Sequence, residues 1–200
     1  MSQITEFIEE FIKMQEHFIK YDKAEASNFN PLLLFTPIND EKTHSNILAW
    51  LFDPLASHSQ GDLFFKAFLN YFNYKVSYDT LKYKVIREFS GLESIVDILI
   101  YGNRFIFFIE NKTLSLEGED QTNREYRDLL RLAESFGIVN DYHAIYLSPY
   151  GQTPQNENFK SISYHKLSSA FKLIRNEIGS EYVRLFVDSW IDISSEIGRL

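Results

Sequence analysis

The chain has 200 residues and carries 20 Lys and Arg against 28 Asp and Glu, which gives a formal net charge of −8. A chain of this length is expected to form one domain that buries on the order of 70% of the surface exposed by its unfolded form. The absence of cysteine excludes disulfides, thiolate zinc sites and cysteine nucleophiles, and it favours the reducing cytoplasm as the location. The acidic balance argues against a protein that coats nucleic acid through its overall charge.

The first elements in chain order are predicted helices. Spacings of three and four predict an amphipathic helix over roughly the first two dozen residues, with a core-facing stripe of Ile4, Phe7, Ile8, Phe11, Ile12, Phe18 and Ile19. The prolines and asparagines of residues 27–39 predict a loop. A second helix follows, capped by Asp40 or Thr43 and ending before Pro54, and a third begins after Asp62. No apolar run reaches the roughly 18 residues of a membrane span, and the acidic start does not fit a signal peptide, so we expect a soluble protein.

The hydrophobic period then changes from that of helices to that of strands. Three neighbouring strands are expected, over residues 81–89, 95–100 and 105–109. Gly102-Asn103 predicts a short hairpin turn between the last two strands. The remaining elements are expected to be a helix, a strand and two helices, over residues 119–136, 142–147, 167–178 and 180–197. This order predicts a layered α/β domain with a mixed sheet.

Charged residues at two of these strands point to chemistry. Asp97 interrupts an apolar strand, and Glu110 and Lys112 stand at the end of the next strand. A hairpin symmetric about Gly102-Asn103 places Asp97 opposite Phe108 and diagonal to Glu110, with both acids and Lys112 on one face. Two carboxylates and an ammonium suit phosphodiester hydrolysis, because Mg²⁺ binds carboxylate and phosphate oxygens while a lysine orients or deprotonates water. The alternative is a surface salt bridge at a strand end.

The order of Asp97 and then Glu110-x-Lys112, across a hairpin of apolar strands, resembles the PD-(D/E)XK nuclease superfamily, whose fold is restriction-endonuclease-like. A second string resembles one bacterial branch of predicted nucleases in that superfamily. It runs through Thr43-His44-Ser45-Asn46, Leu48-Ala49-Trp50-Leu51-x-Asp53-Pro54, Ser57-His58 and Gly61-Asp62-Leu63-Phe64. Together the two matches cover the chain from residue 40 to residue 130 approximately.

The resemblance implies a three-layer core with a central mixed sheet and extra helices at both ends. It also implies a divalent metal, Mg²⁺ or Mn²⁺, held by Asp97 and Glu110, with Lys112 catalytic and Glu41 a supporting acid. Glu88 also matches the branch pattern, either as a further metal ligand or as a charge on the strand face. One domain over 1–200 then comprises a helical lead-in, a catalytic sheet core and C-terminal helices, over 1–75, 81–148 and 165–198.

The helix expected after the third strand carries candidate substrate contacts. The spacing places polar side chains on one face, namely Gln121, Arg124, Arg127 or Asp128, and Arg131. The alternative is a solvated charged face. Related nucleases often have a Gln and a Tyr four residues apart here, whereas Gln121 and Tyr126 are five apart and point to different sides. His44 is a further candidate for substrate binding, although it and His58 could instead form hydrogen bonds within an aromatic core.

We therefore expect a metal-dependent nuclease that cuts nucleic acid, with DNA as the first expectation. It would act in the cytoplasm without a membrane, and as a monomer, a homodimer or with a partner protein. The rival interpretation is a nuclease-like fold without turnover that binds nucleic acid or another protein as a regulatory module. The presence of Asp97, Glu110 and Lys112 together favours the enzyme.

Overall fold

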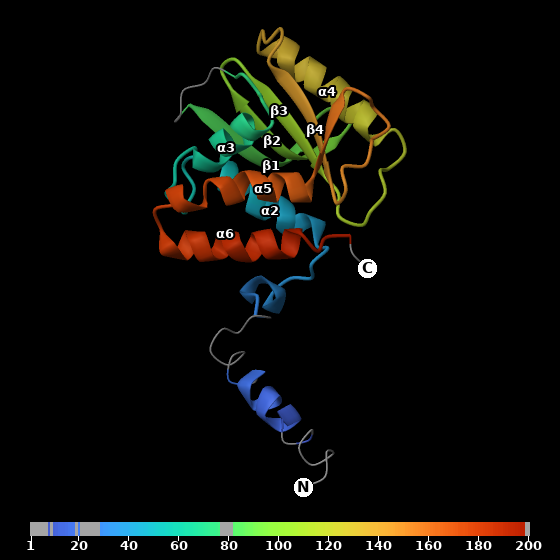
Figure 1. The fold of residues 1–200 in the computed structure, drawn as a ribbon. Helices are drawn as coiled ribbons and strands as arrows, with labels where there is room; N and C mark the ends of the chain where they lie inside the picture. Colours follow the sequence, from blue (N-terminus) through green and yellow to red (C-terminus); the bar gives the residue numbers. More distant parts are fainter. Residues whose placement is uncertain (1–7, 9, 19, 21–28, 77–81, 199–200) are drawn as a thin grey trace.

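A mixed sheet lies between two layers of helices in the computed structural model, which describes residues 8, 10–18, 20, 29–76 and 82–198 (Figure 1). The strands are β1 (Tyr83–Ser90), β2 (Ile95–Gly102), β3 (Ile106–Asn111), β4 (Tyr142–Ser148) and β5 (Phe159–Ser163). The α-helices are α2 (Glu41–Phe52), α3 (Leu63–Tyr71), α4 (Gln121–Ser135), α5 (Tyr164–Leu173) and α6 (Glu181–Ser194). Two 3₁₀ helices complete the order, η1 (Pro31–Leu34) and η2 (Arg175–Glu177).

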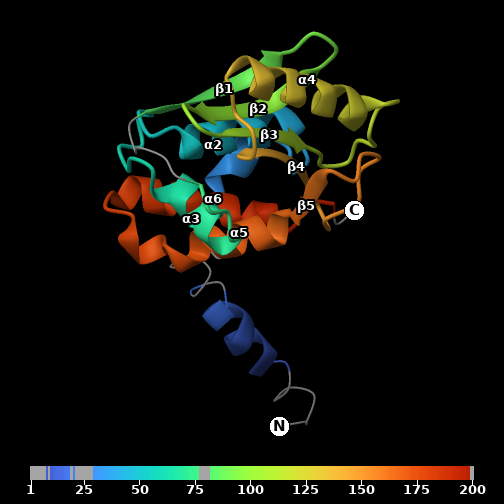
Figure 2. The ribbon, with the colours of Figure 1, turned by 90° about the horizontal axis from the view of Figure 1, so that it is seen from above.

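The five strands lie in the order β1-β2-β3-β4-β5. The first three pair antiparallel, and β3, β4 and β5 pair parallel. Helix α4 covers one face of the sheet, and α2, α3, α5 and α6 cover the other, as the view from above shows (Figure 2). This arrangement confirms the three-layer α/β core with a central mixed sheet. Among the described helices, none is both long and apolar enough to cross a membrane.

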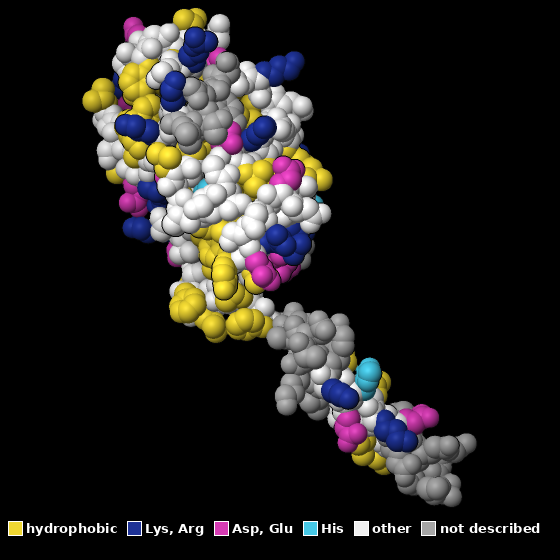
Figure 3. Space-filling view, turned by 90° about the vertical axis from the view of Figure 1, so that its left-hand side faces the viewer, with side chains coloured by type: hydrophobic (Ala, Val, Ile, Leu, Met, Phe, Trp, Pro, Cys, Tyr) yellow, Lys and Arg dark blue, Asp and Glu magenta, His cyan; other side chains and the backbone are white. Residues whose placement is uncertain are grey.

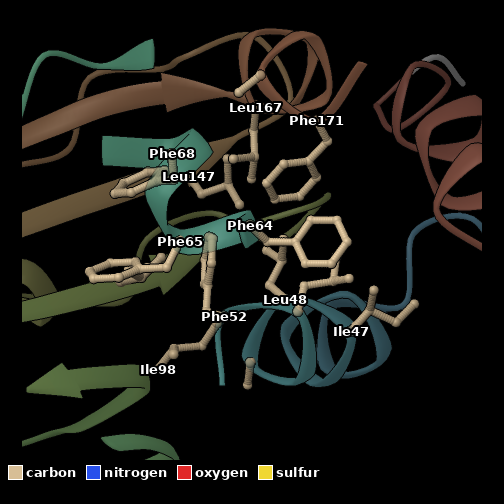
Figure 4. Close-up of a cluster of buried hydrophobic side chains, with 14 of the residues drawn as sticks. Ile47, Leu48, Phe52, Phe64, Phe65, Phe68, Ile98, Leu147, Leu167 and Phe171 are labelled. Atoms are coloured by element: carbon tan, nitrogen blue, oxygen red, sulfur yellow. The ribbon is translucent and has the colours of Figure 1, made fainter. Parts of the chain in front are cut away.

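Alternation along the central strands divides the core into two parts. Ile98 and Ile100 of β2 face the larger part, which is rich in phenylalanine and lies under α2, α3, α5 and α6 (Figure 4). Leu99 faces the smaller part, where Leu129 and Ala133 of α4 pack on the sheet. The sheet is therefore buried on both faces, which holds β3 rigidly at its centre.

The hairpin between β2 and β3 turns one residue later than the sequence predicted. Gly102 still pairs across the hairpin, because its N–H donates to the Phe105 carbonyl at 3.0 Å, and the turn is Asn103-Arg104. A Cβ atom on residue 102 would lie 2.6 Å from the Phe105 ring, so this glycine makes room for an aromatic side chain. The predicted register was therefore wrong by two residues. Ile98 pairs with Ile109 and Leu99 with Phe108, so Phe108 is not the residue opposite Asp97.

The predicted core position of the N-terminal apolar stripe was also wrong for the residues that the structure describes. Residues 8, 10–18 and 20 are helical, but the stripe side chains among them are exposed: Ile8, Phe11, Ile12 and Phe18 are 45% to 70% accessible. The stripe residues Ile4, Phe7 and Ile19 lie outside the described residues. Helical spacing shows that a face is apolar but not what covers it. Here the two faces of the sheet are already covered by other helices (Figure 1).

The C-terminal region differs from the prediction in one strand and one helix. Strand β5 (Phe159–Ser163) was not predicted, because five residues give too little alternation to stand out. The helix expected from residue 167 begins at Tyr164, and Ser163 caps it by accepting a hydrogen bond from the Lys166 N–H at 3.3 Å. The segment expected to continue this helix to residue 178 forms η2 instead.

His44 connects α2 to two other parts of the larger core. It is fully buried, with Nε2 at 2.6 Å from the Ile38 carbonyl and Nδ1 accepting from the Trp190 Nε1–H at 3.2 Å. These contacts require a neutral ring with its proton on Nε2. Burial lowers the pKa of His44 below its usual value, although the Ile38 carbonyl and Asp40 oppose the shift. His44 therefore forms hydrogen bonds within the core, which was the second of the two interpretations that the sequence allowed.

The pH dependence of stability should reveal this neutral histidine. The unfolded chain binds a proton at His44 more readily than the folded chain does, so stability should be lost as pH falls below the unfolded value of 6.5. His44→Gln should lower stability near pH 7.5 by about 1–3 kcal/mol and should show a flatter loss toward pH 5 than the wild type. Denaturant titrations across this range measure both effects.

His165→Gln is the matched control, because the His165 side chain is exposed and solvated in both states. The titration of acidic groups common to all three proteins cancels in the differences between them. Parallel pH profiles for the wild type and His44→Gln would contradict a neutral, buried His44.

Candidate active site

The candidate site forms where β2 and β3 lie side by side at the carboxyl end of β3. Asp97 and Glu110 each lie next to the last pair of the antiparallel register, Ile98 with Ile109, and the Asp97 carboxylate is close enough to raise the pKa of Glu110. Asp97 Oδ2 also accepts the backbone N–H of Asn111 at 2.9 Å. Lys112 follows directly, with its backbone N–H bonded to the Leu147 carbonyl of β4 at 2.8 Å. Paired strands on both sides of β3 thus position the two acids and the lysine.

Lys112 lies between two carboxylates. Its Nζ is 2.7 Å from Glu110 Oε1 and 3.8 Å from Glu41 Oε1, and its side chain is only 10% exposed. Glu41 is the first residue of α2, and its Oε2 accepts the Thr113 N–H at 3.1 Å and the Ser115 hydroxyl at 2.6 Å. The structure therefore brings together four residues that the sequence singled out: Asp97, Glu110, Lys112 and Glu41.

Asn111, the unspecified residue of the Glu-x-Lys triplet, joins three elements at this point. Its side-chain amide donates to the Glu41 carbonyl at 3.0 Å and to Ser45 Oγ at 2.9 Å, both on α2. Its side-chain oxygen accepts from the Tyr164 hydroxyl of α5. Sequence reasoning missed this role, although a fully buried amide at the end of an apolar strand needs such partners.

The electrostatics of the site reflect its burial. Burial raises the pKa of Glu110 to about 7, and the Asp97 carboxylate adds to the shift. Burial also raises the pKa of Asp97, with Glu41 as a further contributor. For Lys112 burial acts in the opposite direction, but the surrounding carboxylates outweigh it and raise its pKa. The site as it stands therefore carries more buried acid than its single ammonium can balance.

Helix α4 adds one residue that sequence reasoning expected and one that it missed. Gln121 Nε2 donates to Glu110 Oε1 and to Glu125 Oε1, the latter at 2.8 Å. Glu125 is fully buried, burial and Glu110 raise its pKa to about 9, and its Oε2 has no hydrogen-bond partner among the described residues. Glu125 occupies the position four residues after Gln121, so the four-residue spacing was the available signal. Tyr126 instead packs toward Phe159 in the smaller core.

The arginines of α4 differ in their partners. Arg131 pairs with Glu93 and, at 3.1 Å, with Asp128, while Arg127 pairs with Glu93 at 2.7 Å and with Asp120 at 3.2 Å. Arg124 donates to the Glu119 backbone carbonyl, and no carboxylate of the described residues lies within ion-pair distance of it. Of the two predicted phosphate contacts, Arg124 therefore has the freer charge.

Asp128 holds the turn between β1 and β2. Its carboxylate accepts the backbone N–H groups of residues 92, 93 and 94 at 2.9 to 3.2 Å and also the Ser94 hydroxyl. A Cβ atom on residue 91 would lie 2.2 Å from the Asp128 carboxylate, so Gly91 permits this approach. Asp128, which the sequence offered only as an alternative to Arg127, is thus a residue that shapes the turn leading into the Asp97 strand.

Glu88 and His44, two further candidates from the sequence, do not join the group of acids around Lys112. The exposed carboxylate of Glu88 contacts Lys42 at 3.3 Å and Arg87 at 3.6 Å, which matches the alternative of a strand-face charge. Its role as a further metal ligand stays a prediction. His44 is a correction: both ring nitrogens are used inside the core, so it is unavailable for the predicted contact to substrate.

The donor set fits a small divalent cation of the magnesium type. Among the described residues, no three His, Asp or Glu side chains form a group arranged to hold a metal. Mg²⁺ does not need such a cage, because it keeps several waters and is held by one or two carboxylates together with substrate phosphate. The neighbouring carboxylates of Asp97 and Glu110, both with raised pKa values, could serve as such ligands, whereas a closed structural zinc site has four protein ligands.

Comparison with known proteins agrees with this geometry. No curated protein and no solved structure matches the chain. One family model, that of the PD-(D/E)XK nuclease superfamily, matches residues 29–191 and so spans every element from η1 to α6 except the end of α6, but not the helical residues 10–18. Because the match covers well over half of the 200 residues and includes the paired acids and lysine, this chain belongs to the PD-(D/E)XK nuclease superfamily.

Proposed function

We propose that this chain is a metal-dependent nuclease that hydrolyses phosphodiester bonds of nucleic acid, and that DNA is its substrate. The observation that carries the proposal is the contact of Lys112 Nζ with Glu110 at 2.7 Å, close to the carboxylate of Asp97. Family membership supports the same reaction class. A nuclease-like module without turnover would have no need for an ammonium and two acids buried at one point, because their assembly is costly.

Asp97 and Glu110 would hold the metal, for which we propose Mg²⁺ or Mn²⁺. When bound, such an ion polarises a phosphate oxygen and lowers the pKa of a bound water. The chain's own groups then have separate tasks. Gln121 and Lys112 both bind Glu110 Oε1, which fixes the orientation of that carboxylate. Asn111 fixes Asp97 through its backbone N–H.

Lys112 is the proposed catalytic cation. Its ammonium donates to Glu110 at 2.7 Å and forms a longer ion pair with Glu41 at 3.8 Å, so a further donor can point to the attacking water or to a phosphate oxygen. A fixed positive charge in a site with little water stabilises the charge that develops in the transition state more than it stabilises the resting substrate. Glu41 would act through Lys112 as a positioning residue.

Divalent metal should stabilise the folded protein. A ligand that only the folded state binds adds RT ln(1 + [L]/Kd), which is about 2.7 kcal/mol at a hundredfold excess over Kd. Thermal or denaturant unfolding with Mg²⁺, Mn²⁺ and chelator measures this gain. Asp97→Asn should remove most of it, whereas Glu157→Gln, at an exposed carboxylate, should retain it. A full metal response in Asp97→Asn would place the ion elsewhere.

Replacement of Lys112 should separate metal binding from chemistry. Lys112→Ala is expected to keep the stabilisation by metal but to lower DNA cleavage by a factor on the order of one hundred or more. Cleavage of plasmid and of single-stranded DNA in Mn²⁺, with chelator as the blank, measures the loss. Lys172→Ala, at an exposed lysine, is the matched control. If Lys112→Ala cut at the wild-type rate, the proposed role of Lys112 would be excluded.

The two α4 arginines should respond differently, because only one of them is paired with acids. Arg124→Ala should weaken DNA binding to unrelated sequences equally and flatten its salt dependence by about 0.7–0.9 in the log–log slope. Arg131→Ala should leave the slope unchanged, because Glu93 and Asp128 already neutralise Arg131. Binding measured in Ca²⁺ at several salt concentrations tests this. A wild-type slope for Arg124→Ala would remove Arg124 from the substrate path.

A further inference from the structure

A pocket of about 390 Å³ opens beside Lys112. Its walls are the segment that follows β3, residues 112–117, and the segment that ends and follows β4, residues 148–155. Tyr146 of β4 also lines it. Because β3 and β4 are parallel and paired, their carboxyl ends meet at one edge of the sheet, and the pocket lies at that edge next to the candidate active site.

The two walls are tied together by hydrogen bonds. The Glu117 carboxylate accepts the Thr122 N–H at 3.0 Å through one oxygen and the Gln155 N–H at 2.7 Å through the other. The Gln152 N–H donates to Ser148 Oγ at 2.8 Å, and its carbonyl accepts from the Ser161 hydroxyl at 2.9 Å. The pocket is therefore a built feature of the fold and not a gap between loose loops.

The lining combines flat apolar surface with uncharged polar groups. Pro149, Pro154, Leu114 and Leu116 supply the apolar part, and Leu116 is 91% exposed beside it. Hydroxyl and amide side chains supply the polar part. Lys112 is the single cation of the lining, and the carboxylate of Glu117 is already hydrogen-bonded through both oxygens. Such a surface suits the face and edge of a nucleobase better than a run of phosphates.

Tyr146 links the pocket to the reacting centre. It pairs with Glu110 in the β3/β4 register, so it stands next to the proposed metal ligand. Its side chain is nearly buried, and its hydroxyl forms no hydrogen bond with the residues that the structure describes. A hydroxyl in that position is available to a ligand that enters the pocket.

We propose that this pocket receives one unpaired nucleobase next to the phosphate that the active site cleaves, so that the chain acts on single-stranded or frayed nucleic acid. This proposal rests on the proposed function, because the pocket is assigned to a nucleobase on the ground that it adjoins the proposed nuclease site. Small-ligand sites span roughly 300–1,000 Å³, and a pocket at the lower end of that range suits one nucleotide and not a stacked base pair. A paired base would have to leave the duplex to enter.

The distribution of charge supports the same substrate. Recognition of a duplex backbone needs several Lys or Arg side chains that neutralise successive phosphates. The chain has a net charge of −8. Figure 3 draws the side of the molecule on which α3 lies, away from the pocket, and the Lys and Arg side chains there are scattered. Arg127 and Arg131 of α4 are paired with acids. Contacts to bases must therefore supply more of the affinity than they do in a typical duplex-binding protein.

The test compares strands with and without bases. A fluorescein-labelled oligothymidylate, the same backbone made of abasic residues, and the annealed duplex are titrated in Ca²⁺ with the full chain and its variants. The wild type should bind the normal strand roughly tenfold more tightly than the abasic strand, in keeping with the worth of one stacked base. It should also bind the single strand more tightly than the duplex.

Thr153→Trp should fill the pocket, because Thr153 lines it and is exposed. This variant should reduce the normal-to-abasic affinity ratio to about one. Val139→Trp places the same ring at a 78% exposed position outside the pocket and should keep the wild-type ratio. Tyr146→Phe, which removes only the hydroxyl, should lower the ratio by a smaller factor without a change of volume.

Equal affinity of the wild type for normal and abasic strands, an unchanged ratio in Thr153→Trp, or preference for the duplex would each overturn the pocket assignment. These readouts do not depend on turnover. Absence of cleavage by the wild type in Mg²⁺ and Mn²⁺ would instead overturn the proposed function, so the two failures are distinguishable.

Discussion

The excess of buried acid over buried base at the end of β3 is the constraint on which the rest of the structure depends. Lys112 neutralises one carboxylate, while burial and proximity raise the pKa values of Asp97 and Glu110, and Glu125 lies buried just beyond them. Such a group relaxes by moving apart unless its members are held. Asn111 and Gln121 hold them, the first from within β3 and the second from α4. A bound cation, or protons on the carboxyl groups, would neutralise the remaining negative charge.

The residues that hold these acids are themselves fixed by the apolar core, which packs on both faces of the sheet. Ile109 points into the aromatic-rich core under α2 and α5, whereas Phe108 packs on the side of α4, so β3 is fixed from both faces up to the residue before Glu110. The apolar alternation stops there, and the chain presents polar side chains at the sheet edge where β3 and β4 end. Asn111 extends the attachment by binding α2 and α5. The acids are thus held by the best-packed part of the molecule.

Much of the fold and the centre of the site could be predicted from the sequence. The spacing of apolar residues distinguishes helices from strands, and Asp97, Glu110 and Lys112 stand out because they interrupt or follow apolar strands. The closeness of Asp97 and Glu110 was expected although the register was wrong by two residues, and the Asp97 carboxylate does act on the pKa of Glu110. A shared face does not follow from the register, because Val96 packs with Leu99 in the smaller core, so the alternation of β2 is interrupted at Asp97. The shift itself was not predictable, because Gly102 serves the Phe105 ring and only mimics a turn signal. Long-range partners were likewise hidden. The burial of His44 against Trp190, the exposure of the N-terminal stripe and the orphan oxygen of Glu125 all depend on which elements meet in space.

The two ends of α4 differ in what their charged residues contact. Toward the end of the helix, Arg127, Asp128 and Arg131 bind the turn between β1 and β2. Their charges therefore stabilise the fold and add little to the electrostatic potential around the protein. At its start, Gln121 and Glu125 face Glu110, where more negative charge is added. If the chain acts as proposed, attraction of a phosphate to this place would come from a bound cation together with Lys112, and contacts to bases would supply the remainder of the affinity. Under the proposed function, the same acids that oppose nucleic acid in the absence of metal would help to bind it when Asp97 and Glu110 hold a cation.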